Sequence, residues 1–223
     1  MEISRRTVLG SVLAATAGTL AAGAAKAADQ KGAPMKKYRN EDFYTADGTF
    51  DVEAARNAYY EMMAHFNYPI VPRLRTEEFW AIDFGMGRFM EVGMAGIFWV
   101  NNRQDNYFGH EIYLLPGQMI PEHRHVATAD AGPKMEAWQP RHGWIYIYGE
   151  GEPTPGVEAR IPESHRECAV ARKEQKLMPG EIGMLAGAEQ WHWMQAPEGA
   201  IVTEYATYHD NAGLRFSHPQ VRF

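Results

Sequence analysis

Short apolar runs separated by glycine and proline dominate the chain from residue 95 onward. The runs are four to eight residues long, which is the length of a buried strand. They occupy residues 96–100, 110–115, 144–148, 174–177, 182–185 and 200–205. Many short strands with turn residues between them predict a β-sandwich or a β-barrel.

Two helices are expected before these strands. Asp51 is a plausible N-cap for a helix that runs to about Phe66, and Thr76 would cap a second, short helix over residues 76–80. An apolar stripe on the first helix indicates that it packs on something. The stripe consists of Tyr59, Met62, Met63 and Phe66. Helices followed by about eight strands predict a mainly β (α+β) chain, a jelly-roll β-barrel with N-terminal helices packed on it.

The first 27 residues have the layout of an export signal. Arg5 and Arg6 precede a weakly apolar stretch of Ala, Gly and Leu, which ends at the small-x-small site Ala25-Lys26-Ala27. The paired arginines favour the twin-arginine route and a periplasmic location. The alternative is a membrane anchor, but residues 8–25 are mostly Ala, Gly and Thr and too weakly apolar for a good span. Residues 28–50 lack periodicity and are expected to form an extended arm.

The net negative charge of the chain argues against nucleic acid as a partner. The chain carries 28 acidic and 22 basic side chains, a net charge of −6, and loss of residues 1–27 would make it more negative. An acidic surface repels phosphate backbones, so we expect no nucleic-acid partner. No basic amphipathic stretch indicates binding to a membrane surface once the signal is cleaved. A single cysteine, Cys168, rules out an internal disulfide.

Three histidines and one glutamate have the spacing of a metal site. His123 and His125 lie two apart, so in a strand both imidazoles point to one face. Glu136 can add a carboxylate from the next strand, and His192 a third imidazole. Three nitrogens and one oxygen suit Mn, Fe, Zn, Co or Ni. A lone His-x-His often arises by chance, and the alternative is a scatter of surface histidines.

The surrounding residues strengthen the metal prediction. Gly117 lies six residues before the first histidine, and Pro179-Gly180 precedes the third. With Glu136, these residues form a pattern that resembles the two-part signature of the cupins. We therefore expect residues 51–223 to form one cupin domain with an N-terminal helical extension.

A more specific resemblance covers roughly residues 75–221. The chain is similar to the D-lyxose isomerase family of cupins at several segments. They are residues 121–125 (PEHRH), 132–136 (GPKME), 146–155 (YIYGEGEPTP) and 192–204 (HWMQAPEGAIVTE), with shorter matches at 83–87, 92–94 and 116–118. The resemblance implies aldose–ketose isomerisation, typically of D-lyxose to D-xylulose, supported by Mn²⁺ or by Zn²⁺, Co²⁺ or Fe²⁺. It makes His123, His125, Glu136 and His192 the ligands, and Lys134 and Glu204 the candidate catalytic residues.

The chemistry of such an isomerase is consistent with these residue types. Moving a proton between C1 and C2 of an open-chain aldose passes through an enediolate, which needs a Lewis acid, a base and an acid. Glu204 is a reasonable base, and Lys134 could donate to oxygen or shuttle the proton. Two alternatives stay open: Glu204 bonded to a metal-ligating histidine, and Lys134 as a solvated loop charge.

The remaining histidines and the tryptophans are weaker candidates for functional residues. His65, His110, His142, His165, His209 and His218 lack the geometry of the metal set, and we interpret His142 as structural. A group of aromatic residues is expected to line the barrel, with one or two in the wall of a sugar pocket. The group is Trp138, Trp144, Trp191, Trp193 and Phe216.

The C-terminal run departs from the family pattern, which leaves the sugar open. The family's acidic-Ile-Phe-Thr-Asp-Pro run is replaced here by residues 213–219, where Leu214 or Arg215 stands for an acidic residue and His218 for an aspartate. Two other functions remain possible: an exported protein that binds a sugar or a metal without turnover, and an iron-dependent dioxygenase. A homodimer is expected, because cupins commonly dimerise.

Overall fold

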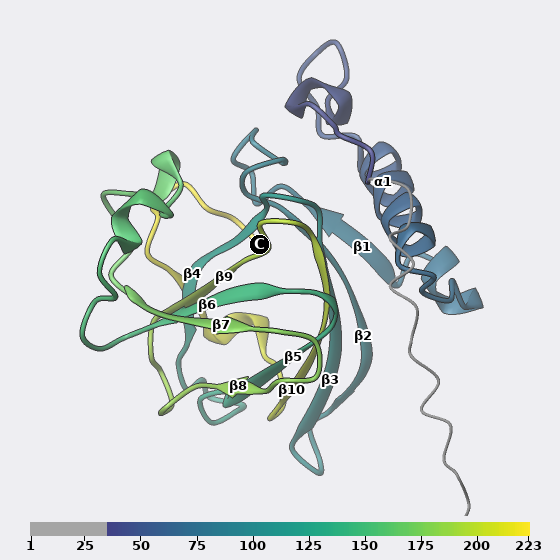
Figure 1. Cartoon of the computed structure of the whole chain (residues 1–223). Coiled ribbons are helices and arrows are strands. Elements are labelled where there is room, and N and C mark those ends of the chain that lie inside the picture. The colour runs from purple at the N-terminus through teal and green to yellow at the C-terminus, as the bar shows by residue number, and fades with distance from the viewer. Residues whose placement is uncertain (1–34) are drawn as a thin grey trace, which may run out of the picture. The chain divides into compact units, whose positions relative to one another are not determined.

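Two antiparallel sheets form the framework of the computed structural model, which describes residues 35–223 (Figure 1). The six-stranded sheet has the order β1 (Phe79–Ile82), β2 (Met94–Asn102), β3 (Tyr107–Leu114), β10 (Ala200–Ala206), β5 (Glu136–Gly143), β8 (Gly183–Met184). The five-stranded sheet has the order β11 (Leu214–Phe216), β4 (Met119–His125), β9 (His192–Gln195), β6 (Ile145–Gly149), β7 (Lys173–Leu177). The prediction of a mainly β chain is confirmed. The predicted signal peptide, residues 1–27, lies outside the described residues.

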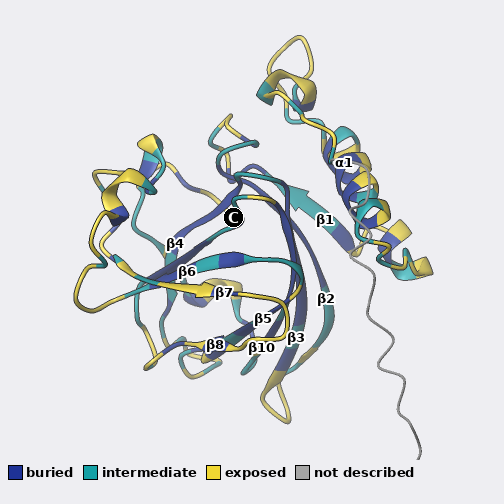
Figure 2. Ribbon diagram, in the orientation of Figure 1, coloured by how far each residue is buried: buried dark blue, intermediate teal, exposed yellow. Residues whose placement is uncertain are grey.

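The core lies between the two sheets. Because successive side chains of a strand point to opposite faces, alternate residues of each strand meet in this interior. Ile112 of β3, Val202 of β10 and Trp193 of β9 are nearly inaccessible to solvent and belong to one apolar cluster. Burial of such large apolar side chains stabilises the fold by about 1.5–3 kcal/mol each. Figure 2 shows the inner strands as buried and the connecting loops as largely exposed.

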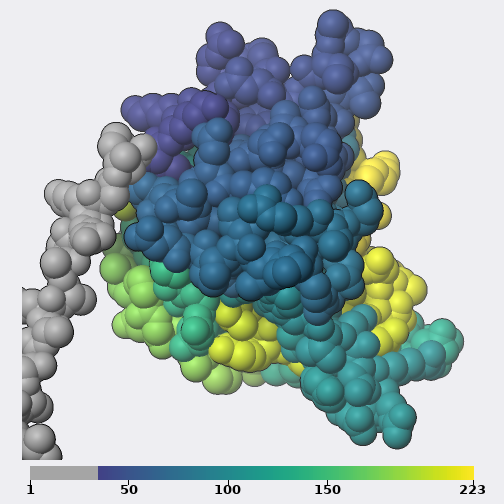
Figure 3. Space-filling model, turned by 90° about the vertical axis from the view of Figure 1, so that its right-hand side faces the viewer, coloured from purple at the N-terminus to yellow at the C-terminus, as the bar shows by residue number. Residues whose placement is uncertain are grey.

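Helix α1 (Val52–His65) covers the outer face of the six-stranded sheet (Figure 3). The predicted cap is confirmed, since the Asp51 carboxylate accepts a hydrogen bond from the Ala54 backbone N–H at 2.9 Å. Tyr59, Met62 and Met63 of the predicted stripe are fully buried and form a second apolar cluster with residues of β1, β2 and β3. The helix therefore protects the sheet face that points away from the interior.

The expected second helix over residues 76–80 is wrong. A 3₁₀ helix, η2 (Pro72–Arg75), ends before it, and strand β1 begins at Phe79. Thr76 does accept a hydrogen bond from the Glu78 backbone N–H at 3.2 Å, but only within a local turn. Phe79 pairs with Ile97 of β2 and is 1% exposed. Sheet pairing and burial outweigh the local helix signal here.

Further 3₁₀ helices lie in the connections. They are η1 (Asn40–Phe43), η3 (Val157–Ala159), η4 (Glu163–His165) and η5 (Asn211–Gly213). Residues 35–50, the described part of the expected arm, contain η1 and an isolated bridge between Tyr44 and Phe50. Phe43 in this segment is buried, with its ring centroid 4.7 Å from that of Phe89. None of the described helices is long and apolar enough to cross a membrane.

Candidate active site

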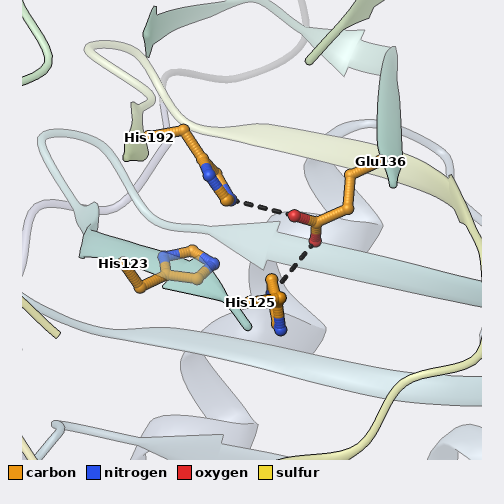
Figure 4. Close-up of side chains that lie close together, drawn as sticks. All are labelled: His123, His125, Glu136 and His192. Atoms are coloured by element: carbon orange, nitrogen blue, oxygen red, sulfur yellow. Dashed lines mark ion pairs between the residues drawn. The ribbon is translucent and has the colours of Figure 1, made fainter. Parts of the chain in front are cut away.

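The structure brings together the four residues predicted as metal ligands (Figure 4). His123 and His125 lie on β4, Glu136 begins β5 and His192 begins β9. One potential ligand atom from each residue lies within 4.8 Å of those of the other three. His125, Glu136 and His192 are buried, and His123 is half-buried. The alternative of scattered surface histidines does not describe these residues.

Sheet pairing explains why residues so distant in sequence meet. His123 and His125 share a face because they lie two apart on one strand. His192 is the register partner of His123 across the β4–β9 pair, and their ring centroids are 4.3 Å apart. Glu136 comes from the facing six-stranded sheet. One sheet therefore supplies three imidazoles and the other supplies the carboxylate.

Backbone carbonyls fix the orientation of two of the imidazoles. His123 Nδ1 lies 2.8 Å from the Pro121 carbonyl, and His192 Nδ1 lies 2.9 Å from the Gln190 carbonyl. A carbonyl oxygen only accepts, so each Nδ1 carries a hydrogen and each Nε2 faces the rest of the set. Burial, followed by the neighbouring His192 and His125, also holds the pKa of His123 well below its usual range. A neutral imidazole with a free nitrogen is the form that binds metals.

Two facing atoms of the set lack hydrogen-bond partners. His192 Nε2 and Glu136 Oε2 are buried and face each other as an ion pair at 3.0 Å (Figure 4), and neither atom has a hydrogen-bond partner elsewhere in the described residues. Burial opposes ionisation of Glu136, but the positive charge of Lys134, the largest opposing effect, helps to hold the pKa of this carboxyl well below its usual range. Unpartnered buried polar atoms are costly unless something binds them. A divalent cation that accepts three imidazole nitrogens and one carboxylate oxygen fits this site.

Lys134 lies between two carboxylates next to this set. Its ammonium donates a hydrogen bond to Glu136 Oε1 at 2.9 Å and a second one to Glu204 Oε1. Lys134 and Glu204 are each 4% exposed. The interpretation of Lys134 as a solvated loop charge is therefore wrong, because burial and two ion pairs replace solvent. Glu204 contacts Lys134 and His110 rather than one of the four predicted ligands.

The ion pairs keep these groups charged inside the protein. Burial favours the neutral form of Lys134, but Glu136 and Glu204 outweigh it and raise the pKa of this amine. Burial also opposes ionisation of Glu204, yet Lys134 outweighs it and lowers the pKa of this carboxyl. The site thus holds an ammonium donor beside an ionised carboxylate, which is an acid–base pair.

Two histidines that sequence reasoning set aside also face the cavity. His110 Nδ1 lies 2.9 Å from Glu204 Oε2, and the ring stacks on Trp80 with centroids 5.7 Å apart. Burial, with Lys134 and His125 nearby, lowers the pKa of His209 to about 4. Alternation along the strand predicted over residues 110–115 would have placed His110 on one face with Ile112. His209 follows β10 in a loop, where the sequence carries no such signal.

A cavity surrounds the site, and aromatic side chains form much of its wall. Trp138, Trp193 and Phe216 of the predicted lining group border it. Trp144 and Trp191 do not border it but lie under the cations of Lys176 and Arg124.

Two further groups of residues singled out from the sequence can now be placed relative to the cavity: His142 and the C-terminal run. His142 also lies away from the cavity, with its ring 5.4 Å from that of Phe66. In the C-terminal run that differs from the family pattern, Leu214 borders the cavity and Arg215 is exposed. The prediction that all five aromatic residues line the barrel interior is therefore only partly correct, since three of them border the cavity.

The fold and the site together define a class of protein: a mainly β chain of two antiparallel sheets with a buried cluster of three histidines and one glutamate beside a lysine–glutamate pair. No protein-family model matches the chain. It is 33% identical to a D-lyxose/D-mannose isomerase of Thermosediminibacter oceani, over 77% of this chain and 93% of that protein. It is 32% identical to a D-lyxose ketol-isomerase of Cohnella laeviribosi, over 75% of this chain and 90% of that one. The chain belongs to the D-lyxose ketol-isomerase family, and it is an aldose–ketose isomerase.

A solved structure has the same arrangement of strands as this chain. The L-ribose isomerase of Cellulomonas parahominis superimposes with a TM-score of 0.61 at 14% identity, covering 81% of this chain and 96% of that one. At such low identity the likeness concerns the arrangement of the strands alone. Of the three functions expected from the sequence, isomerisation is the one that the relatives support.

Proposed function

We propose that the protein is a metal-dependent isomerase of the D-lyxose/D-xylulose type. The observation that carries this proposal is the contact between the cluster of His123, His125, Glu136 and His192 and the Lys134–Glu204 ion pair. Relatives named for D-lyxose support this choice of substrate class. The four residues would hold one divalent cation, for which we propose Mn²⁺, with Zn²⁺, Co²⁺ or Fe²⁺ as substitutes. When bound, such an ion supplies Lewis acidity to oxygens that gain negative charge.

Glu204 would move the proton between C1 and C2. Its two carboxylate oxygens already accept hydrogen bonds from Lys134 and from His110, which fix the plane of the carboxylate. Each oxygen has a second lone pair that remains available to a substrate proton. An ionised carboxylate within reach of C2 is a competent base. Its burial also keeps bulk water from exchanging the proton during transfer.

Lys134 would stabilise and protonate the substrate oxygen. Its ammonium is compact and carries three hydrogens, of which Glu136 and Glu204 engage two. The third can point at a carbonyl oxygen of the substrate. The positive charge opposes the negative charge that develops on that oxygen, and the effect is large in a buried site.

One experiment tests both assignments. Protein loaded with Mn²⁺ is incubated with D-lyxose, and formation of D-xylulose is followed. Glu204→Gln should lower turnover by about 100-fold or more, as expected for loss of a general base, while Mn²⁺ stays bound. The matched control is Glu111→Gln, which changes a buried glutamate that accepts hydrogen bonds from Tyr68, Trp99 and Thr203. Absence of ketose from metal-loaded protein would refute the function, and full activity of Glu204→Gln would refute the base.

We also propose that residues 1–27 direct the chain through the twin-arginine route to the periplasm. The pair Arg5 and Arg6 before a weakly apolar stretch supports it. Fusion of residues 1–27 to a folded reporter tests the route, and Arg5→Lys with Arg6→Lys should block export.

Two further proposals concern assembly: the two sheets close as a cupin barrel, and the protein forms a homodimer. Light scattering of the purified protein tests the dimer.

A further inference from the structure

The polar side chains of the cavity form one connected group. Of the 22 residues that border the cavity, 14 are apolar and eight are polar. Six of the polar residues are the four candidate ligands, Lys134 and Glu204. The other two are His110, which contacts Glu204, and His209, whose ring lies 5.5 Å from that of His125. Every polar side chain of the wall therefore belongs to the reacting end of the site or touches it.

Aromatic rings connect the two ends of this polar group. The rings are Trp80, Phe84, Phe216 and Phe223, which we call the aromatic arc. Ring centroids are 5.8 Å apart for Trp80–Phe223, 6.3 Å for Phe223–Phe84 and 6.2 Å for Phe84–Phe216. The arc begins where Trp80 stacks on His110 and ends where Phe216 lies 5.9 Å from His123. It therefore faces whatever part of the substrate extends away from the ligands and Glu204.

The arc offers almost no partner for a hydroxyl group. Among the described residues, the cavity wall contains no Ser, Thr, Tyr, Asn, Gln, Asp or Arg. Outside the polar group, the remaining side-chain donors of the wall are the indole N–H groups of Trp80 and Trp138, because that of Trp193 donates to the Ala171 carbonyl at 2.8 Å. An isomerase acts on the open chain, in which an ordinary aldose carries a hydroxyl on every distal carbon. A hydroxyl buried without a partner loses its hydrogen bonds to water, whereas a methyl group gains from contact with rings.

We infer that the preferred substrate is a terminal-deoxy aldose, a 2-hydroxyaldehyde whose distal end is a methyl group rather than a hydroxymethyl group. This inference rests on the proposed function, because it places C1 and C2 at the ligands and Glu204. The reaction itself is unchanged: one proton moves between C1 and C2, another moves between the two oxygens, and nothing is oxidised or reduced overall. The arc decides only which chain length and which distal substituents fit.

Matched pairs of sugars test the inference. The Mn²⁺-loaded protein is given D-mannose mixed with 6-deoxy-D-mannose, and separately D-talose mixed with 6-deoxy-D-talose, pairs in which both sugars keep the pyranose ring. Within each pair the members differ only in the terminal hydroxyl. We expect the deoxy sugar to react with a kcat/KM about 10- to 100-fold higher, the range for one hydroxyl in an apolar pocket. A ratio near one, or a preference for the hydroxylated sugar, would overturn the inference while leaving the isomerase function intact. If no sugar yields ketose, the proposed function fails and the inference with it.

A substitution in the arc makes the test specific to these rings. Phe216→Gln introduces an amide that can bond a hydroxyl, so the deoxy preference should fall by about fivefold or more. Arg215→Gln is the control, because this neighbour on β11 is exposed and borders no part of the cavity. The ratio is measured within one sample, so a lower yield of folded protein does not affect it. Phe223→Gln, at a position that is 47% exposed, repeats the test where substitution is well tolerated. An unchanged ratio in both arc variants would show that the arc does not contact the distal carbons.

Discussion

His110 Nδ1 lies 2.9 Å from Glu204 Oε2, so the candidate base has a second partner besides Lys134. The two residues face each other across the β3–β10 pair, in which His110 and Glu204 are register partners. Trp80 and Phe98 pack against the ring of His110, and their ring centroids lie 5.7 Å and 4.9 Å from that of the imidazole. A rigid imidazole thus fixes one oxygen of the carboxylate while an ammonium fixes the other.

Removing the donor of His110 should impair turnover without preventing binding. His110→Phe keeps a ring against Trp80 but loses the hydrogen bond, so we expect kcat to fall about 10- to 100-fold, as for other partners of functional groups, with little change in KM. His110→Asn places an amide N–H near the original Nδ1 and should recover part of the loss. Steady-state kinetics of both variants checks this. A smaller loss of kcat in His110→Phe than in His110→Asn would show that the ring acts by packing rather than by orienting Glu204.

The extent to which this site could be predicted depends on how local each signal is. His123 and His125 follow from the two-residue period of a strand, because one stretch of backbone sets both directions. His110 obeys the same period and was missed because it lacks a histidine neighbour. The burial of Lys134 depends on Glu204, 70 residues away, and no property of a lysine indicates it. The helix expected over residues 76–80 failed for the same reason, since the pairing of Phe79 with β2 is a long-range contact.

Loss of Lys134 should destabilise the metal-free protein. Lys134→Met leaves Glu136 and Glu204 without their shared cation at buried positions, and breaking a buried pair in this way costs about 3–5 kcal/mol. Urea unfolding of the metal-free variant measures this loss. Lys36→Met is the control, because the Lys36–Glu61 pair is exposed and its loss should change stability far less.

A second substitution separates charge from packing at this position. Adding Glu204→Gln to Lys134→Met removes one of the two uncompensated carboxylates. The double variant should therefore be more stable than Lys134→Met alone. If it is not, the loss of the lysine side chain's packing, rather than its charge, explains the effect.

Acid should weaken the fold through His165, which lies outside the catalytic cavity. Burial, with His218 nearby, lowers the pKa of His165 to about 4 from an ordinary value of 6.5. Between these values the unfolded chain binds a proton that the folded chain resists, so the free energy of unfolding falls as the pH drops from about 6.5 to about 4. The loss attributable to this residue is at most about 3 kcal/mol, at 1.36 kcal/mol per pKa unit. Unfolding curves of wild type and His165→Gln across this range test it, and parallel pH profiles would contradict the assignment.

Gly96, which lies against the ring of His110, should tolerate substitution as poorly as the histidine itself. A Cβ atom on Gly96 would lie 2.3 Å from His110 Nε2 and 2.6 Å from Trp80 Cζ2, which is far inside van der Waals contact. Gly96→Ala must therefore displace the imidazole or the indole, and a shift of the imidazole breaks its bond to Glu204. Because small misplacements of catalytic groups are costly, we expect kcat to fall about 10-fold or more. Gly132→Ala is the matched control, since a Cβ there meets no atom within 4 Å. Combining Gly96→Ala with His110→Phe should add little further loss in kcat, because both changes remove the same contact; fully additive losses would mean that the glycine acts on another part of the site.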